Sequence, residues 1–412
     1  MRDAFWMSEA VLGGPGLSAA TEGRPTGKSA WEPLEHVPQL DGLRGLAVLL
    51  VVVMHAHWRL PNAPEWAHTW ISLTEWGWTG VDLFFVLSGF LITSILWRYR
   101  KSGNYFLAFY GRRFLRIFPL YYLVLFLLLI VMPVVAPWMV ANLRYPSPWY
   151  WLYGSNIAVS FYGWGPRYLS HFWSLGMEEQ YYLVWPLVVW CAPSRRVLTG
   201  LALGALALTI ATRWYLVTQE WMLTAPYTFP LARLDGFVLG GLVALWRVEL
   251  GTLLRHPSLR TAMFAVIVAV PLAIAIHDVK ALSWSLWTLP WSVSGYFCIA
   301  AYYTLVLVFV LEAPAGRWTH RVMTIPALVD YGKYSYAVYL LHVPVDTIFR
   351  KLEWHPETAL LDYFWWSMPA YTIFLVLISY LLARISWWLL EERCMRLKRY
   401  FRYGPTKEAA AA

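Results

Sequence analysis

Long apolar stretches alternate with short polar and basic segments along most of the chain. The run from Val48 to Met54, for example, is aliphatic without a break. Because a helix needs about 20 mainly apolar residues to cross a bilayer, the pattern predicts an all-α polytopic membrane protein, a bundle of about ten transmembrane helices. The predicted spans are residues 42–58, 79–97, 115–135, 172–191, 198–217, 231–246, 261–276, 291–311, 331–348 and 366–390.

One further apolar stretch, residues 148–160, is too short to cross and is predicted to be a re-entrant or interfacial helix. Residues 1–38 contain no apolar run and are rich in Gly, Ser, Ala and Pro, which predicts a disordered tail rather than a cleavable signal peptide. The expected organisation is therefore this tail, a transmembrane domain over residues 39–399, and a C-terminal tail over residues 400–412.

The composition supports a membrane protein. The 412 residues are 59% hydrophobic and only 14% charged, whereas about a quarter of a soluble protein is charged. The 27 tryptophans and 26 tyrosines suit aromatic belts at two membrane interfaces. Cys191, Cys298 and Cys394 lie far apart and form no zinc or disulfide pattern, so no metal site is expected.

The basic residues gather in alternate loops, which sets the expected orientation. They concentrate in residues 98–116, 195–196, 247–260, 317–333 and 393–407. The positive-inside rule makes this side cytoplasmic and puts both termini there. The net charge of +9 is then a property of these loops, and no nucleic-acid partner is expected.

Two ionisable residues lie in the first predicted span. Arg44 and His55 are eleven positions apart, just past three helical turns, so they share one helix face about 16 Å apart along the axis. His57 points the other way. Ionisable groups inside a membrane are rare and most often functional, so Arg44 and His55 are the first candidates for a site.

Other predicted spans also carry polar groups, which together describe a polar interior. They are Asp82 in span 79–97, His171, Glu178 and Glu179 at the outer end of span 172–191, Arg233 and Asp235 in span 231–246, and Lys333 and His342 in span 331–348. Each has a structural alternative, a buried ion pair that holds the bundle together. For Arg233 and Asp235 the two interpretations are equally favoured.

These segments resemble the acyltransferase-3 family of integral membrane acyltransferases. The Arg44–His55 spacing within "LDGLRGLAVLLVVVMHAH" is similar to the defining motif of the family. It is followed in the family's order by "VDLFFVLSGFLIT", "FYGRRFLRIFPLYY", "HFWSLGMEEQYYLVWPL", "ARLDGFVLGG" and "YGKYSYAVYLLHVPV". The resemblance covers residues 38–399.

The chain departs from the family pattern near its end. The segment "EERCMR" has Arg393 where proline is common, which puts a role for Glu391 in doubt. Only a short tail follows Tyr403, so the extracytoplasmic hydrolase-like domain that some members carry is not expected.

The resemblance implies a reaction: transfer of an acyl group, usually acetyl, from cytoplasmic acyl-CoA to a hydroxyl of an acceptor, often a sugar of a surface or exported polysaccharide. Acyl-CoA would be a co-substrate rather than a bound cofactor, and the protein would lie in a bacterial inner membrane. His55, Arg44 and Glu178 are the catalytic candidates. With an ordinary pKa near 6.5, His55 suits a general base, and it equally suits a transient acyl carrier.

The remaining candidates fall into two groups. Arg112, Arg113 and Arg116 suit the phosphates of CoA, although a basic loop is also an ordinary membrane anchor. Arg44 would hold donor phosphates or pantetheine carbonyls. The residues expected to bind substrate or to form a structural polar core are Asp82, His171, Trp173, Arg233, Asp235, Tyr336 and His342.

Two other functions suit a polar membrane core. One is a proton-coupled transporter of a sugar or lipid-linked glycan, with His55 and Glu178 as a proton relay. The sequence shows no internal repeat of the kind many transporters have. The other is a membrane scaffold held by buried ion pairs. Consumption of labelled acetyl-CoA distinguishes the enzyme from both.

Overall fold

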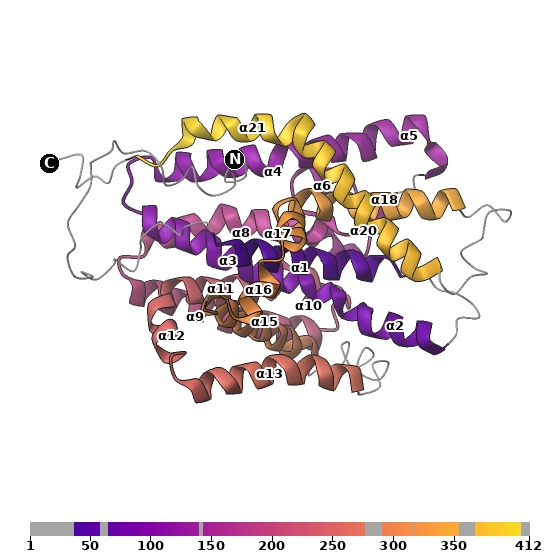
Figure 1. The fold of residues 1–412 in the computed structure, drawn as a ribbon. Helices are drawn as coiled ribbons and strands as arrows, with labels where there is room; N and C mark the ends of the chain where they lie inside the picture. The colour runs from indigo at the N-terminus through magenta and orange to yellow at the C-terminus, as the bar shows by residue number, and fades with distance from the viewer. Residues whose placement is uncertain are drawn as a thin grey trace, which may run out of the picture.

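The computed structural model describes residues 37–57, 65–139, 143–276, 291–314, 316–353 and 367–404 (Figure 1). All regular secondary structure in these ranges is helical, which confirms the predicted all-α class for the described part of the chain. Most of the two predicted tails, residues 1–36 and 405–412, lies outside the described residues.

The helices of the first half begin with α1, which carries Pro38 in its first turn, where a missing N–H is tolerated. The elements are α1 (Pro38–His55), α2 (Glu65–Glu75), α3 (Gly80–Tyr99), α4 (Tyr105–Phe126), α5 (Met132–Val135), α6 (Pro148–Trp151), α7 (Ser155–Tyr162), α8 (Phe172–Cys191) and α9 (Arg195–Thr218). A π-helical turn, Leu127–Val131, joins α4 to α5.

The second half contains shorter and more bent helices. Its elements are α10 (Ala225–Thr228), α11 (Asp235–Leu245), α12 (Arg247–Leu253), α13 (Pro257–Ile276), α15 (Tyr296–Leu311), α16 (Trp318–Met323), α17 (Pro326–Lys333), α18 (Ser335–Glu353), α20 (Ser367–Ser386) and α21 (Glu392–Arg396). The π-helical turn Trp387–Glu391 connects α20 to α21.

Within the described residues, length and apolar composition identify fewer candidate membrane spans than the ten predicted. Six stretches qualify: Pro38–His55, Thr69–Tyr99, Tyr105–Val135, Arg195–Thr218, Trp291–Leu311 and Met368–Phe401. A seventh is added if α11 and α12, which meet at a bend of 79°, form one broken span. The count of about ten is therefore not confirmed. Two of the missing spans, α8 and α18, are long helices whose apolar sequence is interrupted by the polar residues described below.

The outer surface of the bundle is apolar, as a multi-pass membrane protein requires. Leu123 and Ile130 on the α4–α5 stretch, Leu208 on α9 and Leu377 on α20 are all exposed. Leu43 of α1, by contrast, is fully buried. Large side chains that would be unfavourable in water thus face outward, where lipid chains solvate them.

Glycines bring α1 unusually close to α16 and α17. A Cβ atom on Gly332 would overlap the carbonyl oxygen of Asp41, and one on Gly42 would overlap the backbone of Met323. Only hydrogen fits at these positions, so the start of α1 packs directly against the backbone of its neighbours.

The apolar stretch over residues 148–160 falls on two short helices, α6 and α7. Both are too short to cross a membrane, as the sequence predicts.

Candidate active site

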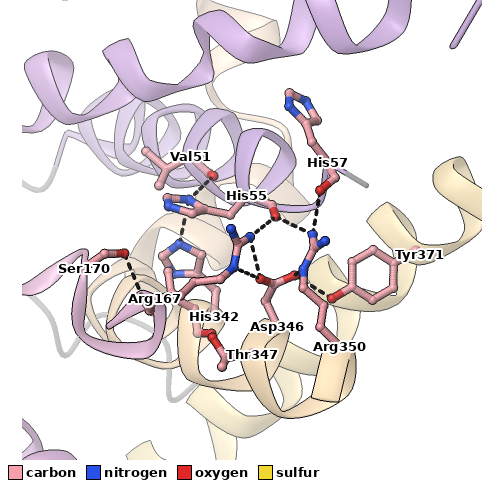
Figure 2. Close-up of polar contacts among 11 residues, drawn as sticks. Val51, His55, His57, Arg167, Ser170, His342, Asp346, Thr347, Arg350 and Tyr371 are labelled. Atoms are coloured by element: carbon pink, nitrogen blue, oxygen red, sulfur yellow. Dashed lines mark hydrogen bonds and ion pairs between the residues drawn. The ribbon is translucent and has the colours of Figure 1, made fainter. Parts of the chain in front are cut away.

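Three histidines from distant parts of the sequence meet at one end of the bundle. His55 ends α1, His171 directly precedes α8, and His342 lies in α18. The ring centroids of His55 and His342 are 4.9 Å apart (Figure 2), and those of His171 and His342 are 5.5 Å apart. All three were sequence candidates, and the fold brings them together.

Hydrogen bonds define the tautomers of two of these rings. Nδ1 of His342 lies 2.7 Å from the carbonyl oxygen of Tyr339 and 3.2 Å from that of Val338, so Nδ1 carries the proton and Nε2 accepts. Nδ1 of His55 faces two acceptors, the Val51 carbonyl oxygen at 2.9 Å and Nε2 of His342 at 3.3 Å, as Figure 2 shows. His55 Nδ1 is therefore protonated, and its Nε2 keeps the lone pair that a base or nucleophile needs.

The third histidine, His171, is buried beside His342. Its Nε2 donates to the carbonyl oxygen of Leu340 over 3.0 Å. Its buried Nδ1 has no hydrogen-bond partner among the described residues. The three rings therefore form a cluster of edge-to-face contacts, with lone pairs available on His55 and His171.

A carboxylate and two arginines lie beside the histidines; with Tyr371 they form the Asp346 cluster (Figure 2). Arg167 donates to Oδ2 of Asp346 through Nε at 2.8 Å and through a terminal nitrogen at 2.7 Å. Arg350 donates through Nε to Oδ1 at 2.7 Å, and the Tyr371 hydroxyl donates to the same oxygen at 2.6 Å. The side chain of Asp346 is fully buried, so these four bonds replace its hydration.

The same two arginines hold the end of α1. Arg167 and Arg350 each donate to the carbonyl oxygen of His55 over 3.1 Å, and Arg350 also donates to that of His57 over 2.7 Å. The last carbonyls of a helix have no partner inside the helix. The Asp346 cluster satisfies the carbonyl of His55, the last residue of α1, and that of His57 just beyond it, and thereby fixes the backbone that carries the His55 ring.

A cavity of about 70 Å³ lies toward the other end of the bundle, between α1, α3, α4, α8 and α18. Arg44, Arg113 and Arg116 line one side of it. Arg44 is 4.0 Å from the carboxylate of Asp41, one turn earlier on α1. Three guanidinium groups facing one cavity form a site suited to phosphate or another polyanion. Arg112 is not among the lining residues.

Glu178 also lines this cavity. Its carboxylate accepts hydrogen bonds from the Ser88 hydroxyl at 2.9 Å and the Tyr182 hydroxyl at 3.3 Å. The sequence suggested the outer end of the span, near the histidines. The structure places Glu178 seven residues into α8 from His171, about 10 Å along the helix, on the arginine side. Glu178 and His55 are therefore not placed for direct proton transfer between them.

Two hydroxyl groups separate the cavity from the histidines. Ser174 and Tyr339 line the cavity and hydrogen-bond each other at 2.5 Å. Ser174 also donates to the carbonyl oxygen of His171 over 3.1 Å, and the Tyr339 ring is centred 5.5 Å from that of His342. The cavity and the histidines are thus neighbours with one pair of side chains between them.

Arg233 and Asp235 do not pair with each other, because side chains two positions apart point in different directions. Instead Arg233 binds Asp82 of α3 at 2.7 Å, and Asp235 binds Arg213 of α9 at 2.6 Å. All four side chains are at most 1% exposed. This buried quartet does not line the cavity.

The remaining candidate residues from the sequence lie beside the buried quartet or in the arginine-lined cavity. Trp173 packs against Tyr227 with ring centroids 4.5 Å apart, beside the buried quartet rather than in the cavity. Tyr336 lines the cavity and donates to the Ile117 carbonyl oxygen at 2.9 Å. In the described part of the chain, no group of three or more His, Cys, Asp or Glu side chains is arranged to hold a metal ion.

Sequence reasoning missed Arg167, Arg213, Asp346 and Arg350. Asp346 and Arg350 had a usable signal, because they follow His342 at intervals of four residues and so share its helix face. Arg213 is an arginine inside a predicted span. Arg167 begins a short 3-10 helix, Arg167–Leu169, and carries no pattern of its own.

These features define a class: a multi-pass helical membrane protein whose interior places an arginine-lined cavity next to a histidine cluster. The sequence profile of the "Acyltransferase domain" family, of the acyltransferase-3 type, matches residues 37–384, and the chain belongs to that family. The expected resemblance is thereby confirmed.

Several similar proteins are named O-acetyltransferases. The chain is 26% identical over 406 residues to O-acetyltransferase OatA of Staphylococcus aureus strain MRSA252, an alignment that covers 92% of this chain and 60% of that protein. It is 36% identical over 163 residues to peptidoglycan O-acetyltransferase OatA of Listeria monocytogenes, covering 37% of this chain and 24% of that protein. The putative peptidoglycan O-acetyltransferase YrhL of Bacillus subtilis is 35% identical over 162 residues, covering 37% and 23%.

The chain therefore spans about 60% of the length of the relative that it matches over most of its own length. No solved structure matches it. Nothing in these similarities supports a transporter.

Proposed function

We propose that the protein is a membrane O-acyltransferase that moves an acyl group, most naturally acetyl, from acyl-CoA to a hydroxyl of a carbohydrate acceptor. The observation that carries the proposal is α1, a single helix that presents Arg44 to the arginine-lined cavity and His55 to the histidine cluster. Acyl transfer from CoA to an alcohol needs a site for a polyanionic donor and a base for the acceptor hydroxyl.

In this proposal the phosphates of CoA bind Arg113, Arg116 and Arg44, and the acyl end reaches the histidines past Ser174 and Tyr339. Nε2 of His55 removes the proton from the acceptor hydroxyl, whose oxygen attacks the thioester carbonyl carbon. The C–S bond breaks, and the departing sulfur takes the proton from His55. The products are an ester and free CoA.

The same lone pair allows a second route, in which His55 Nε2 attacks the thioester and carries the acyl group to the acceptor. Both routes require neutral His55 with the proton on Nδ1, which agrees with its contacts to Val51 and His342. A labelled acyl group retained on the protein after brief reaction and acid quenching would favour the carrier route, and its loss in His55→Ala would assign it.

We further propose a glycan of the cell envelope as the acceptor. The support is the activity for which the Listeria relative is named, peptidoglycan O-acetylation. The proposed orientation, with the arginine-lined cavity toward the cytoplasm of a bacterium and the histidine end outside, rests on the basic loops of the sequence.

The direct test uses full-length protein in lipid nanodiscs with radiolabelled acetyl-CoA and soluble peptidoglycan fragments. We expect labelled ester on the glycan and free CoA in equal amounts, both absent with His55→Ala. Release of CoA without any labelled glycan would keep the donor and reject this acceptor. No consumption of acetyl-CoA by folded protein would reject the function.

A further inference from the structure

A second, larger hollow lies outside the candidate site. It is a groove of about 800 Å³ bounded by α12, the start of α13, the end of α15 and the start of α16. Figure 1 shows α12 turning away from the end of α11 and leading to α13, which runs along the edge of the bundle. None of the residues that line the groove also lines the arginine cavity of the candidate site.

The 79° bend between α11 and α12 shapes this groove. Arg195, at the start of α9, holds the bent arm: it binds Glu249 of α12 at 2.7 Å and donates to the Leu245 carbonyl oxygen at 3.3 Å. The Arg195 guanidinium also lies 4.0 Å from the ring centroid of Trp246. With α11 inside the bundle, α12 extends sideways from its end, as a helix at a membrane interface does.

The lining of the groove is strongly basic. Arg247 and Arg255 come from α12 and the turn after it, Arg260 from α13 and Arg317 from the start of α16; Glu312 is the one acidic lining residue. Within the described residues, none of these five side chains forms an ion pair. Four guanidinium groups and one carboxylate leave the groove with a net positive charge, so its natural occupant is an anion.

The anion must also tolerate apolar surroundings. Phe264 of α13 and Trp318 of α16 form one wall, with ring centroids 5.7 Å apart, and both are exposed. Beyond them, Val268 and Leu272 continue an exposed apolar strip along α13. A charged end and an apolar strip that leads away from it match the two parts of a phospholipid rather than a fully water-soluble phosphate.

We infer that this groove binds an anionic phospholipid, its phosphate held by Arg255, Arg260 and Arg317 and its chains lying along α13. The occupant is a lipid of the surrounding membrane and not the acyl donor, because the groove lies on elements that contribute nothing to the arginine cavity. The inference does not depend on the proposed acyltransferase activity.

The test is native mass spectrometry of the full chain in detergent, titrated with phosphatidylglycerol or with phosphatidylcholine of identical chains. We expect tighter binding of phosphatidylglycerol. Because each basic residue near a membrane surface contributes about 1 kcal/mol toward anionic lipid, the combined variant Arg255→Gln, Arg260→Gln, Arg317→Gln should weaken phosphatidylglycerol binding by at least about tenfold.

A matched variant controls for total charge. Arg196→Gln, Arg393→Gln, Arg399→Gln removes the same charge from exposed positions outside the groove and should bind phosphatidylglycerol as the unchanged protein does. Equal binding of the two lipids, or equal losses in the two variants, would overturn the inference. Displacement of phosphatidylglycerol by CoA, with the same sensitivity to the groove substitutions, would reassign the groove to a soluble phosphate. If the combined variant does not fold, Arg255→Gln alone is titrated, with Arg196→Gln as its control.

Discussion

The Asp346 cluster and the buried quartet are two groups of arginines and aspartates that differ in what their arginines do. In the quartet two arginines meet two aspartates, so the charges balance. The remaining bonds of Arg213 go to the carbonyl oxygens of Ala232 and Val293, which carry no chemistry. In the Asp346 cluster two arginines share one aspartate, and their remaining bonds go to the carbonyl oxygens of His55 and His57.

The two groups also differ in exposure. All four side chains of the quartet are sealed inside the bundle, whereas the side chain of Arg167 is 47% exposed. A balanced, sealed network holds helices together and is strongly destabilised when one partner is lost. An unbalanced network with a path to water, attached to a candidate catalytic residue, is expected to act on activity instead. Buried charge alone therefore does not identify a functional residue; the contacts of its partners do.

The largest effect should come from the residue that the Asp346 cluster positions. His55→Ala should reduce acyl transfer by about 10²–10⁴-fold, because it removes the proposed base or acyl carrier. Rates per folded protein in nanodiscs measure this. His57→Ala is the control, since the His57 side chain contacts Thr74 on α2 instead of the other histidines, and it should keep most activity. If the rate of transfer by His55→Ala is within a few-fold of that of the unchanged protein, His55 is neither the base nor the acyl carrier.

A substitution in the buried quartet should lower the stability of the protein. Asp235→Asn leaves Arg213 buried without its charge partner, which should lower the free energy of unfolding by about 3–5 kcal/mol. Thermal unfolding in detergent, with the rate measured on the folded fraction, separates the two effects. A stable Asp235→Asn protein with greatly reduced turnover would show that the quartet belongs to the site.

Asp346→Asn should lower activity rather than stability. Without the carboxylate charge, Arg167 and Arg350 no longer hold the end of α1, and a displacement of about 1 Å at the reacting group reduces kcat by about 100-fold. The KM for acyl-CoA should change little, because Asp346 does not line the arginine cavity. A rise in donor KM at constant kcat would contradict the positioning role.

The smallest effects should occur in the arginine cavity. Arg113→Ala should raise the KM for acyl-CoA by about tenfold through loss of a charge-assisted hydrogen bond, with kcat nearly unchanged. Arg112→Ala is the matched control, because Arg112 lies next in sequence but does not line the cavity. Equal KM values for both variants would return these arginines to the role of a membrane anchor.

Within the same cavity, Glu178→Gln should lower activity more than Glu179→Gln. The carboxylate of Glu178 faces the cavity and binds Ser88 and Tyr182, whereas Glu179 does not line it. Initial rates at saturating donor measure the difference. Equal losses would mean that acidity at this position of α8, rather than a specific contact, matters.

Helix periodicity predicted the all-α fold class and several residues that the structure brings together in the candidate site. The separation of Arg44 and His55 on one helix face follows from helix geometry alone, and the structure keeps it. The predicted number of spans is not confirmed, because the polar residues of α8 and α18 leave these helices less apolar than the described helices that qualify as spans. The partners of Arg233 and Asp235 come from α3 and α9, and no local pattern specifies which distant helices will pack together.

Helix α1, whose start packs closely against α16 and α17 through glycines, sets the spacing between two candidate site residues. Because Arg44 and His55 lie on one helix, the helical rise separates their positions by about 16 Å along its axis. The close contacts of α1 with α16 and α17 hold that helix in place. A donor that engages both must carry its anionic group at the end of a long arm. Acetyl phosphate, whose charge and acyl carbon share one bridging oxygen, is too short to do so. The rigid helix would then select donors by reach, before any chemistry at the acyl group begins.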